Sequence, residues 1–150
     1  LIRVIAGEIE GHVGPGKSFT PITIAHVTLA PGASVSIPWN PMFNALAYSL
    51  GGSGRVGEDG PGTASAPISV GGLAVFGHGD RIVLTADATQ DARYGALEIF
   101  LLGGQPIREP VVAYGPFVMN SKAEIIAAME DYQYRRFGQI PDDALQPFHG

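Results

Sequence analysis

The sequence predicts an all-β domain with a single helix near its C-terminus. The 150 residues include 21 glycines and 12 prolines, and only 15% of them are charged, a composition that favours short strands separated by turns. Strand-like segments also recur at short spacing as far as residue 102. At this length we expect one domain, folded as a β-sandwich or a small barrel.

Eight segments have the composition of strands, and turns rich in Gly, Pro or Asp separate most of them. They are residues 2–7, 22–30, 34–37, 44–50, 54–56, 73–76, 81–85 and 96–102. In the second segment, apolar residues from Ala25 to Leu29 alternate with His26 and Thr28, which predicts a strand with one buried face. In the last segment Glu98 is the one polar residue, which predicts a central strand.

The chain changes character in its last third. Residues 103–120 hold three prolines and no clear period, which predicts an irregular extended arm. Ser121 and Glu124 then form a capping box that predicts the start of a helix. We expect the Ser121 hydroxyl to accept a hydrogen bond from the Glu124 amide, and the Glu124 carboxylate to accept one from the Ser121 amide.

The predicted helix carries one apolar stripe and ends near residue 138. The stripe consists of Ile125, Met129 and Tyr132. Arg135 and Arg136 suit the negative end of the helix, and Gly138 is expected to terminate it. We therefore expect a barrel at 1–104, an arm and C-terminal helix at 105–138 that belong to the same domain, and a loose tail at 139–150.

Charge and hydropathy disfavour two classes of partner. The net charge of -5 and the pI near 5.2 oppose direct binding to nucleic acid, which depends on Lys and Arg displacing counterions from phosphates. Apolar runs such as residues 99–104 are far shorter than the roughly 18 residues of a membrane helix. We expect no membrane association and, by default, a cytoplasmic protein. The absence of cysteine excludes disulfides and thiolate zinc sites.

The stretch "GGQPIREPVVAYGPFVMNSKAEI" at 103–125 closely resembles the C-terminal signature of the pirin family. The segments "LAPGASV" at 29–35 and "GHGD" at 77–80, with the Gly turn at 51–54, fit the same family in order and spacing. Pirins consist of two cupin barrels in tandem. The resemblance implies that this chain is the second one, a jelly-roll-like double-stranded β-helix with an extended arm and one C-terminal α-helix. The first residue is Leu and not Met, which fits a fragment of such a bicupin protein.

In the family, the metal lies in the first barrel, held by three His and one Glu. Set against this chain, the usual ligand pattern falls at five positions: Pro38, Asn40, Asn44, Leu84 and Ala86. None of these side chains supplies an imidazole or a carboxylate, whereas a non-haem iron site of this type needs at least two His and a carboxylate. The resemblance therefore implies no metal, no catalytic residue and no cofactor in this chain, and iron or another divalent transition metal in the N-terminal barrel of the parent protein.

Three further groups of residues are candidates for a function. The four histidines, His12, His26, His78 and His149, lack the spacing of a rebuilt metal site. A small pocket in the barrel has as its candidate residues Trp39, Asn40, Phe43, Asn44 and Tyr48. The alternative is that these side chains simply fill the barrel, and in either case buried Asn amides would need partners.

The third group lies on the arm, where no sheet face is available to bury its apolar residues. The candidate interface residues are Tyr114, Phe117, Val118 and Met119. We expect them to be covered by the N-terminal cupin domain of the same protein or by self-association, the alternative being that the arm folds back on its own barrel.

The function expected from these observations is that of a metal-free cupin domain. It would be a structural or binding support for a metal-bearing N-terminal barrel. Some pirins oxidise flavonols such as quercetin, so one alternative makes the parent a quercetin 2,3-dioxygenase-like, metal-dependent oxidoreductase. Others bind transcription regulators, so a second alternative makes the parent a protein-binding transcription co-regulator.

Overall fold

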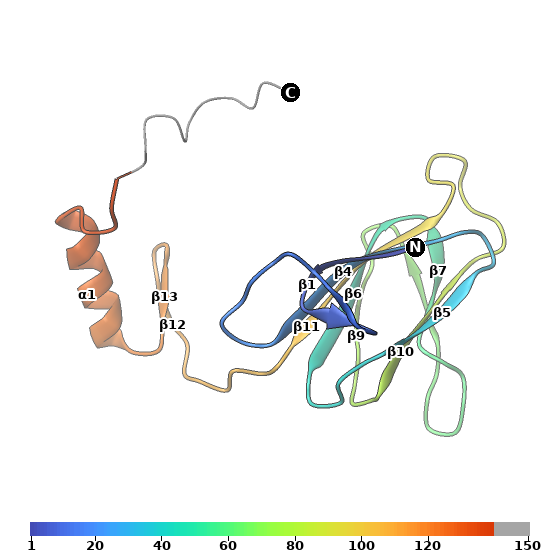
Figure 1. Ribbon diagram of the computed structural model, residues 1–150, viewed down its shortest axis with the longest axis horizontal. Helices are drawn as coiled ribbons and strands as arrows, with labels where there is room; N and C mark the ends of the chain where they lie inside the picture. Colours follow the sequence, from blue (N-terminus) through green and yellow to red (C-terminus); the bar gives the residue numbers. More distant parts are fainter. Residues whose placement is uncertain (140–150) are drawn as a thin grey trace. The chain divides into compact units, whose positions relative to one another are not determined.

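Figure 1 shows the computed structural model, which describes residues 1–139. The chain forms two compact units, one from Leu1 to Ile107 and one that begins at Arg108. The body of strands with one helix confirms the predicted all-β class. No helix within residues 1–139 is long and apolar enough to cross a membrane.

The first unit consists of two antiparallel sheets that face each other across one core, and we call it the barrel. The five-stranded sheet has the order β1 (Ile2–Ala6), β4 (Ile22–Leu29), β11 (Leu97–Gly104), β6 (Asn44–Gly51) and β9 (Leu73–Val75). The four-stranded sheet has the order β5 (Ser34–Pro38), β10 (Arg81–Ala86), β7 (Ser53–Val56) and β8 (Ala66–Ser69). A small hairpin of β2 (Glu8–Ile9) and β3 (His12–Val13) lies between β1 and β4 in the chain.

All eight predicted strands are present, and three short strands of this unit were not predicted. Strand β8 contains Pro67, and a proline in the sequence argues against predicting a strand there. It is nevertheless the edge strand of its sheet, where a missing N–H donor is tolerated. The β2–β3 hairpin turns at Glu10 and Gly11, which have φ values of 47° and 80°. A two-residue turn with both φ values positive is the tight turn that joins antiparallel strands, although Glu is not a residue that signals it.

The alternation of β4 and the central place of β11 are confirmed. Along β4 buried and half-buried residues alternate, with Ala25, Val27 and Leu29 facing inward. Strand β11 lies between β4 and β6 and pairs with both over most of its length. The core therefore forms where inward residues of both sheets meet, and its most deeply buried large side chains are Ile37, Leu84, Leu97, Ile99, Leu101 and Val27.

The second unit is a hairpin followed by a helix, and it corrects the predicted irregular arm. Strands β12 (Val112–Tyr114) and β13 (Phe117–Met119) pair through a two-residue turn. Gly115 has a φ of 57° and Pro116 fixes its own φ near -65°, which is the backbone combination of a type II′ hairpin turn. The prolines that concealed this pattern lie before the hairpin and in its turn, where they cost no ladder hydrogen bond.

Helix α1 (Lys122–Gln133) begins at the predicted cap, with one difference. The Ser121 hydroxyl accepts from the Glu124 N–H at 3.3 Å, as expected. The Glu124 carboxylate, however, accepts from the Asn120 N–H at 3.1 Å and from the Ser121 hydroxyl at 3.0 Å, and not from the Ser121 amide. The cap thus ties the end of the hairpin to the helix, because Asn120 follows β13 directly.

The helix ends five residues before the predicted Gly138. The Arg135 N–H donates to the Tyr132 carbonyl and the Arg136 N–H to the Asp131 carbonyl, the two bonds of a Schellman motif. Arg135 takes the left-handed position of that motif with a φ of 55°, a place more often held by Gly. On the helix, Ile125 and Ala128 are buried, whereas the predicted stripe residue Tyr132 is exposed.

The predicted domain boundaries stay predictions in part. The barrel was expected to end at residue 104, and the first compact unit ends at Ile107. Whether the arm and helix belong to the same domain as the barrel stays a prediction. Of the predicted tail at 139–150, all but Gln139 lies outside the described residues.

Candidate functional site

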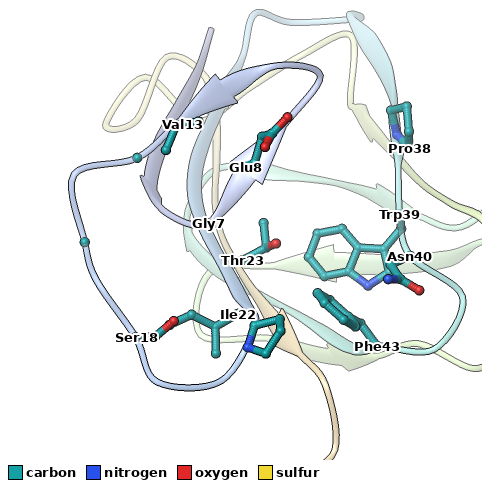
Figure 2. Close-up of a pocket in the computed structure, with 13 residues that line it drawn as sticks. Gly7, Glu8, Val13, Ser18, Ile22, Thr23, Pro38, Trp39, Asn40 and Phe43 are labelled. Carbon is teal, nitrogen blue, oxygen red and sulfur yellow. The ribbon is translucent and has the colours of Figure 1, made fainter.

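A pocket of about 490 Å³ opens at one end of the barrel, between residues 7–21 and residues 38–43 (Figure 2). The first segment is the connection from β1 to β4, and the second joins β5 to β6. Trp39 and Phe43 form one wall, the Thr23 side chain lies at the back, and Glu8 lies on the opposite segment. This volume is in the range of small-molecule sites.

Glycines hold the connection from β1 to β4 close to its neighbours. The Gly14 N–H donates to the Gly7 carbonyl at 2.9 Å, and the Gly16 N–H donates to the Ile5 carbonyl at 2.8 Å. Gly7 has a φ of 75°, and a Cβ added there would meet the Ile22 carbonyl oxygen at 2.0 Å. The wall of the pocket on this side therefore depends on the absence of side chains.

Trp39 is the most unusual residue of the pocket. It is only 8% exposed, and its backbone N–H donates to the Asp80 carbonyl at 2.8 Å. Its indole Nε1 is buried and makes no hydrogen bond within the described structure. Buried polar groups are normally hydrogen-bonded, so this N–H is an unsatisfied donor that an acceptor could pair.

The pocket is poor in charge. Among the described residues that line it, Glu8 is the only ionisable one, and it carries a carboxylate. Neither lysine nor arginine lines it, so it offers no positive charge to a phosphate or a carboxylate ligand. The remaining polar groups are the hydroxyls of Ser18 and Thr23 and the Asn40 amide.

Three of the five predicted pocket residues line this pocket and two do not. Trp39, Asn40 and Phe43 belong to it, whereas Asn44 and Tyr48 do not. Both are exposed on β6, where Tyr48 lies on the outward face. The expectation of buried amides is wrong, because Asn40 is also exposed and its Oδ1 accepts from the Met42 N–H at 2.9 Å in the turn between β5 and β6.

The five predicted ligand positions do not converge on one point. Pro38, Asn40 and Asn44 are exposed, whereas Leu84 and Ala86 are buried in the core. The buried residues of these segments lie one position away from the exposed three, and they are Ile37 on β5, Trp39 just after it and Ala45 on β6. That the five positions descend from a metal site stays a prediction.

The side chains of residues 1–139 do not fit a transition metal. They contain no group of three or more His, Asp or Glu residues that could hold one. Among the inward positions, Leu84 and Ala86 are apolar and Trp39 offers only an N–H donor, whereas such metals require imidazole, thiolate or carboxylate ligands. His12 and His78 are exposed and separate, and His149 lies outside the described residues.

A polar cluster on the outward face of the five-stranded sheet was not predicted. His26 Nε2 lies 2.6 Å from Glu98 Oε2, and the Thr28 hydroxyl donates to the same oxygen at 2.8 Å. Alternation had already placed His26 and Thr28 on one face, and Glu98 was the one polar residue of its strand. Only the register, in which Thr28 lies opposite Glu98, brings the three together.

Apolar side chains surround this cluster. Ile5, Tyr48, Leu50, Leu73 and Val75 are all between 37% and 76% exposed. Tyr48 and Leu50 alternate with buried residues on β6, and Leu73 and Val75 flank the half-buried Ala74 on β9, so these four share the outward face of the sheet with His26 and Glu98, and Ile5 adjoins it at the irregularity of β1. We call this surface the outer sheet face. Sheets that face water on one side usually carry mostly polar residues there, whereas this face combines the polar cluster, Arg3 and Asn44 with these exposed apolar side chains.

The predicted interface residues of the hairpin divide into two pairs. Tyr114 and Val118 are each 63% exposed, while Phe117 and Met119 are half-buried. The Phe117 ring lies 6.1 Å from that of Tyr132 and 6.0 Å from that of Phe137, between ring centroids. Phe117 therefore joins the hairpin to the helix, and only Tyr114 and Val118 of the four have most of their surface free.

Comparison with known proteins gives a consistent result. Residues 24–138 match the family model of the pirin C-terminal cupin domain. The chain is 39% identical over 137 residues to "Pirin-like protein 2" of Arabidopsis thaliana, covering 91% of this chain and 41% of that protein. It is 31% identical over 137 residues to human "Pirin", covering 91% and 44% of the two chains.

Among solved structures, a quercetin 2,3-dioxygenase from Acinetobacter baumannii superimposes with a TM-score of 0.77 at 29% identity. The match covers 93% of this chain and 44% of that one. The predicted cupin-type barrel with one C-terminal helix is thereby confirmed, with the hairpin of β12 and β13 in place of the predicted extended arm. The chain spans less than half the length of the relatives it matches.

Proposed function

The chain belongs to the pirin family as a C-terminal cupin domain, and on this premise we propose that it is a metal-free support for a metal-bearing N-terminal barrel of the same protein. The match covers 41% and 44% of two of these relatives, which leaves in each of them enough chain for a second domain. Iron or another divalent transition metal is expected in that other barrel. This chain would contribute a docking surface and no reacting group.

The outer sheet face is the observation that favours a supporting role. Its apolar side chains are exposed on the five-stranded sheet, and Leu73 and Val75 belong to its edge strand β9. Contiguous apolar patches of this kind mark interaction surfaces, since water contact with them is unfavourable. The outward face of a sheet can pack against the face of a second sheet.

The polar cluster supplies what an apolar face lacks, which is a preferred orientation. Glu98 accepts from Thr28 and lies within hydrogen-bonding distance of His26, so the cluster is already paired within the barrel. It can therefore be covered by a partner without leaving an unpaired charge. The exposed Arg3, which lies opposite His26 on β1, adds a cation at this point that would favour an acidic group of the partner.

A second candidate function is that of the C-terminal domain of a quercetin 2,3-dioxygenase-like enzyme. The solved structure of that name covers almost the whole of this chain at 29% identity, which supports the idea. In this reading the N-terminal barrel holds the metal and performs the reaction, and this chain shapes the entrance for the substrate. The residues of the present barrel would then affect substrate binding and not the chemical step.

Titration of this chain with the separately expressed N-terminal barrel of the same protein tests the proposal. We expect saturable heat of binding for the wild-type chain, and a loss of affinity of tenfold or more, which is roughly 1.4 kcal/mol, for Leu73→Asp. Met42→Asp is the matched control, because Met42 is 66% exposed in the turn between β5 and β6 and not on the outer sheet face. Equal binding of both variants would contradict the proposed surface.

The two functions are separated by flavonol turnover in the assembled pair. If the support role is the whole role, Leu73→Asp lowers activity only through loss of assembly, and excess N-terminal barrel restores it. If this chain shapes the entrance, the Michaelis constant for quercetin changes even in the saturated complex. Turnover by this chain alone, above a heat-inactivated control, would contradict both.

A further inference from the structure

We propose that the pocket beside Trp39 binds a small flat molecule with both a hydrogen-bond acceptor and an N–H donor, of the primary-amide class. This site is separate from the outer sheet face, because its lining residues come from the connections at one end of the barrel. The inference therefore goes beyond the supporting role and does not depend on it.

The acceptor is required by the Trp39 indole. Its Nε1 is buried and has no partner within the described residues. A buried donor without an acceptor is unfavourable, and a ligand carbonyl would satisfy it. The N–H is shielded from water in this structure, and Figure 2 places Phe43 beside the indole nitrogen. Phe43 is only half-buried and lies in the turn before β6, so we expect its ring to move aside when a ligand enters.

The donor is favoured by Glu8, which is exposed at the rim of the pocket. This carboxylate lies on the segment facing the Trp39 wall (Figure 2), and it can only accept hydrogen bonds when it is ionised. Within residues 1–139, no lysine or arginine lines the pocket to neutralise it. Anionic ligands such as carboxylates and phosphates are therefore disfavoured, and ligands with N–H groups are favoured.

The walls of the pocket favour a planar ligand. Trp39 and Phe43 present aromatic rings, and the buried Thr23 closes the back of the pocket. Aromatic walls favour a planar ring over a branched aliphatic body of the same size. A primary aromatic amide combines the three properties, because its carbonyl accepts, its NH₂ group donates and its ring is planar.

The single tryptophan makes the site directly observable. Because Trp39 is the one Trp in the sequence, the ¹H–¹⁵N spectrum of the full chain contains a single indole signal. Benzamide, benzamidine and benzoate have the same shape but offer acceptor and donor, donor only, and acceptor only, respectively. We expect benzamide to shift the indole signal saturably, benzamidine, a cation that can bind Glu8 but offers no acceptor to the indole, to bind without this hydrogen-bond shift, and benzoate to leave the signal unchanged.

Two glutamates provide the test of the donor contact. Glu8→Gln should weaken benzamide binding by roughly fivefold or more, since it replaces a charged acceptor by a neutral one. Glu10→Gln is the matched control, because Glu10 is exposed in the adjacent turn and does not line the pocket. Ligand-detected NMR on Trp39→Phe should show weaker binding of benzamide and unchanged binding of benzamidine.

Several results would overturn the proposal. One is an indole signal that none of the three compounds moves at their solubility limits, which would mean that water alone occupies the pocket. Another is a shift of equal size with benzoate, which would mean that the charge of Glu8 has no influence. A third is equal weakening by Glu8→Gln and Glu10→Gln, which would show a general effect of charge and not a contact in the pocket.

Discussion

At residue 103 the absence of a side chain decides how Trp39 packs. A Cβ added to Gly103 would meet the Asn44 carbonyl oxygen at 2.2 Å and the Trp39 Cζ2 atom at 2.5 Å. The backbone oxygen belongs to a paired strand and cannot move cheaply. A single glycine on β11 therefore makes room both for the strand pairing and for the aromatic wall of the pocket.

We predict that Gly103→Ala lowers the free energy of unfolding by about 1–3 kcal/mol or more, because it overpacks this contact. Urea unfolding followed by fluorescence measures the loss, and the emission of the single Trp should shift to the red as Trp39 becomes wetter. Gly77→Ala is the control, since a Cβ there meets nothing within 4 Å. Equal stability of the two variants would show that the strand yields easily at this point.

The inward-facing residues at the expected ligand positions of the barrel disfavour metal binding. Leu84 and Ala86 are 0% and 2% exposed and face the core with apolar groups. We predict that the purified chain carries no stoichiometric iron, nickel, copper or zinc after dialysis, as measured by elemental analysis. About one equivalent of a metal, lost in His26→Ala, would contradict this prediction and assign a site to the outer sheet face.

At the scale of elements, hydrogen bonds hold the loop between β7 and β8. The Asp59 carboxylate accepts from the Ser65 N–H at 2.7 Å and from the Ser65 hydroxyl at 3.0 Å. Arg55 donates to the same residue, at 2.7 Å to its hydroxyl and 2.8 Å to its carbonyl. The bond from the Ser65 amide, followed by that from its hydroxyl, lowers the pKa of Asp59 below its ordinary value.

A lowered pKa in the folded state means that the ionised carboxylate is the form that the loop stabilises. Its contribution is present above the ordinary aspartate pKa of about 3.9 and is lost as pH falls through the lower, folded value. We predict that the Ser65 amide resonance titrates with its midpoint below that ordinary value. The titration should vanish in Asp59→Asn, and a midpoint at or above the ordinary value would contradict the prediction.

At the scale of the whole molecule, the exposed hairpin residues bear on self-association. Phe117 packs against Tyr132 and Phe137, whereas Val118 on the same strand is 63% exposed. The two positions therefore separate folding from association, which a change at Phe117 alone cannot do. If two copies pair through the hairpin, Val118 is the residue that the partner covers.

We predict that the chain runs as a dimer or larger species on light scattering and that Val118→Asp shifts it to a folded monomer. Phe117→Asp should instead loosen the helix from the hairpin, which circular dichroism would detect as lost helix signal. A wild-type chain that is monomeric at all concentrations would contradict self-association. Unchanged helix signal in Phe117→Asp would contradict the structural role of its ring.

The sequence by itself determined the features that depend on neighbours along the chain. The alternation of Ala25, Val27 and Leu29 and the Ser121 cap were predicted because period and capping involve residues only two or three positions apart. The predicted end of the helix was wrong for a reason that is also local. Arg135 adopts a left-handed conformation, which is more often found for Gly, so the helix ends before Gly138.

Only the tertiary structure decided which distant residues meet. Thr28 and Glu98 are 70 positions apart and touch because β4 and β11 pair in one particular register. Just after β5, Trp39 continues the inward side of Ile37 and is buried, whereas Asn40 is exposed in the turn. A shift of one residue along β5 would exchange the two sides. The local sequence does not show which of two neighbouring residues points into the core when either could be buried there. The pocket, the polar cluster and the outer sheet face therefore became visible only in the folded chain.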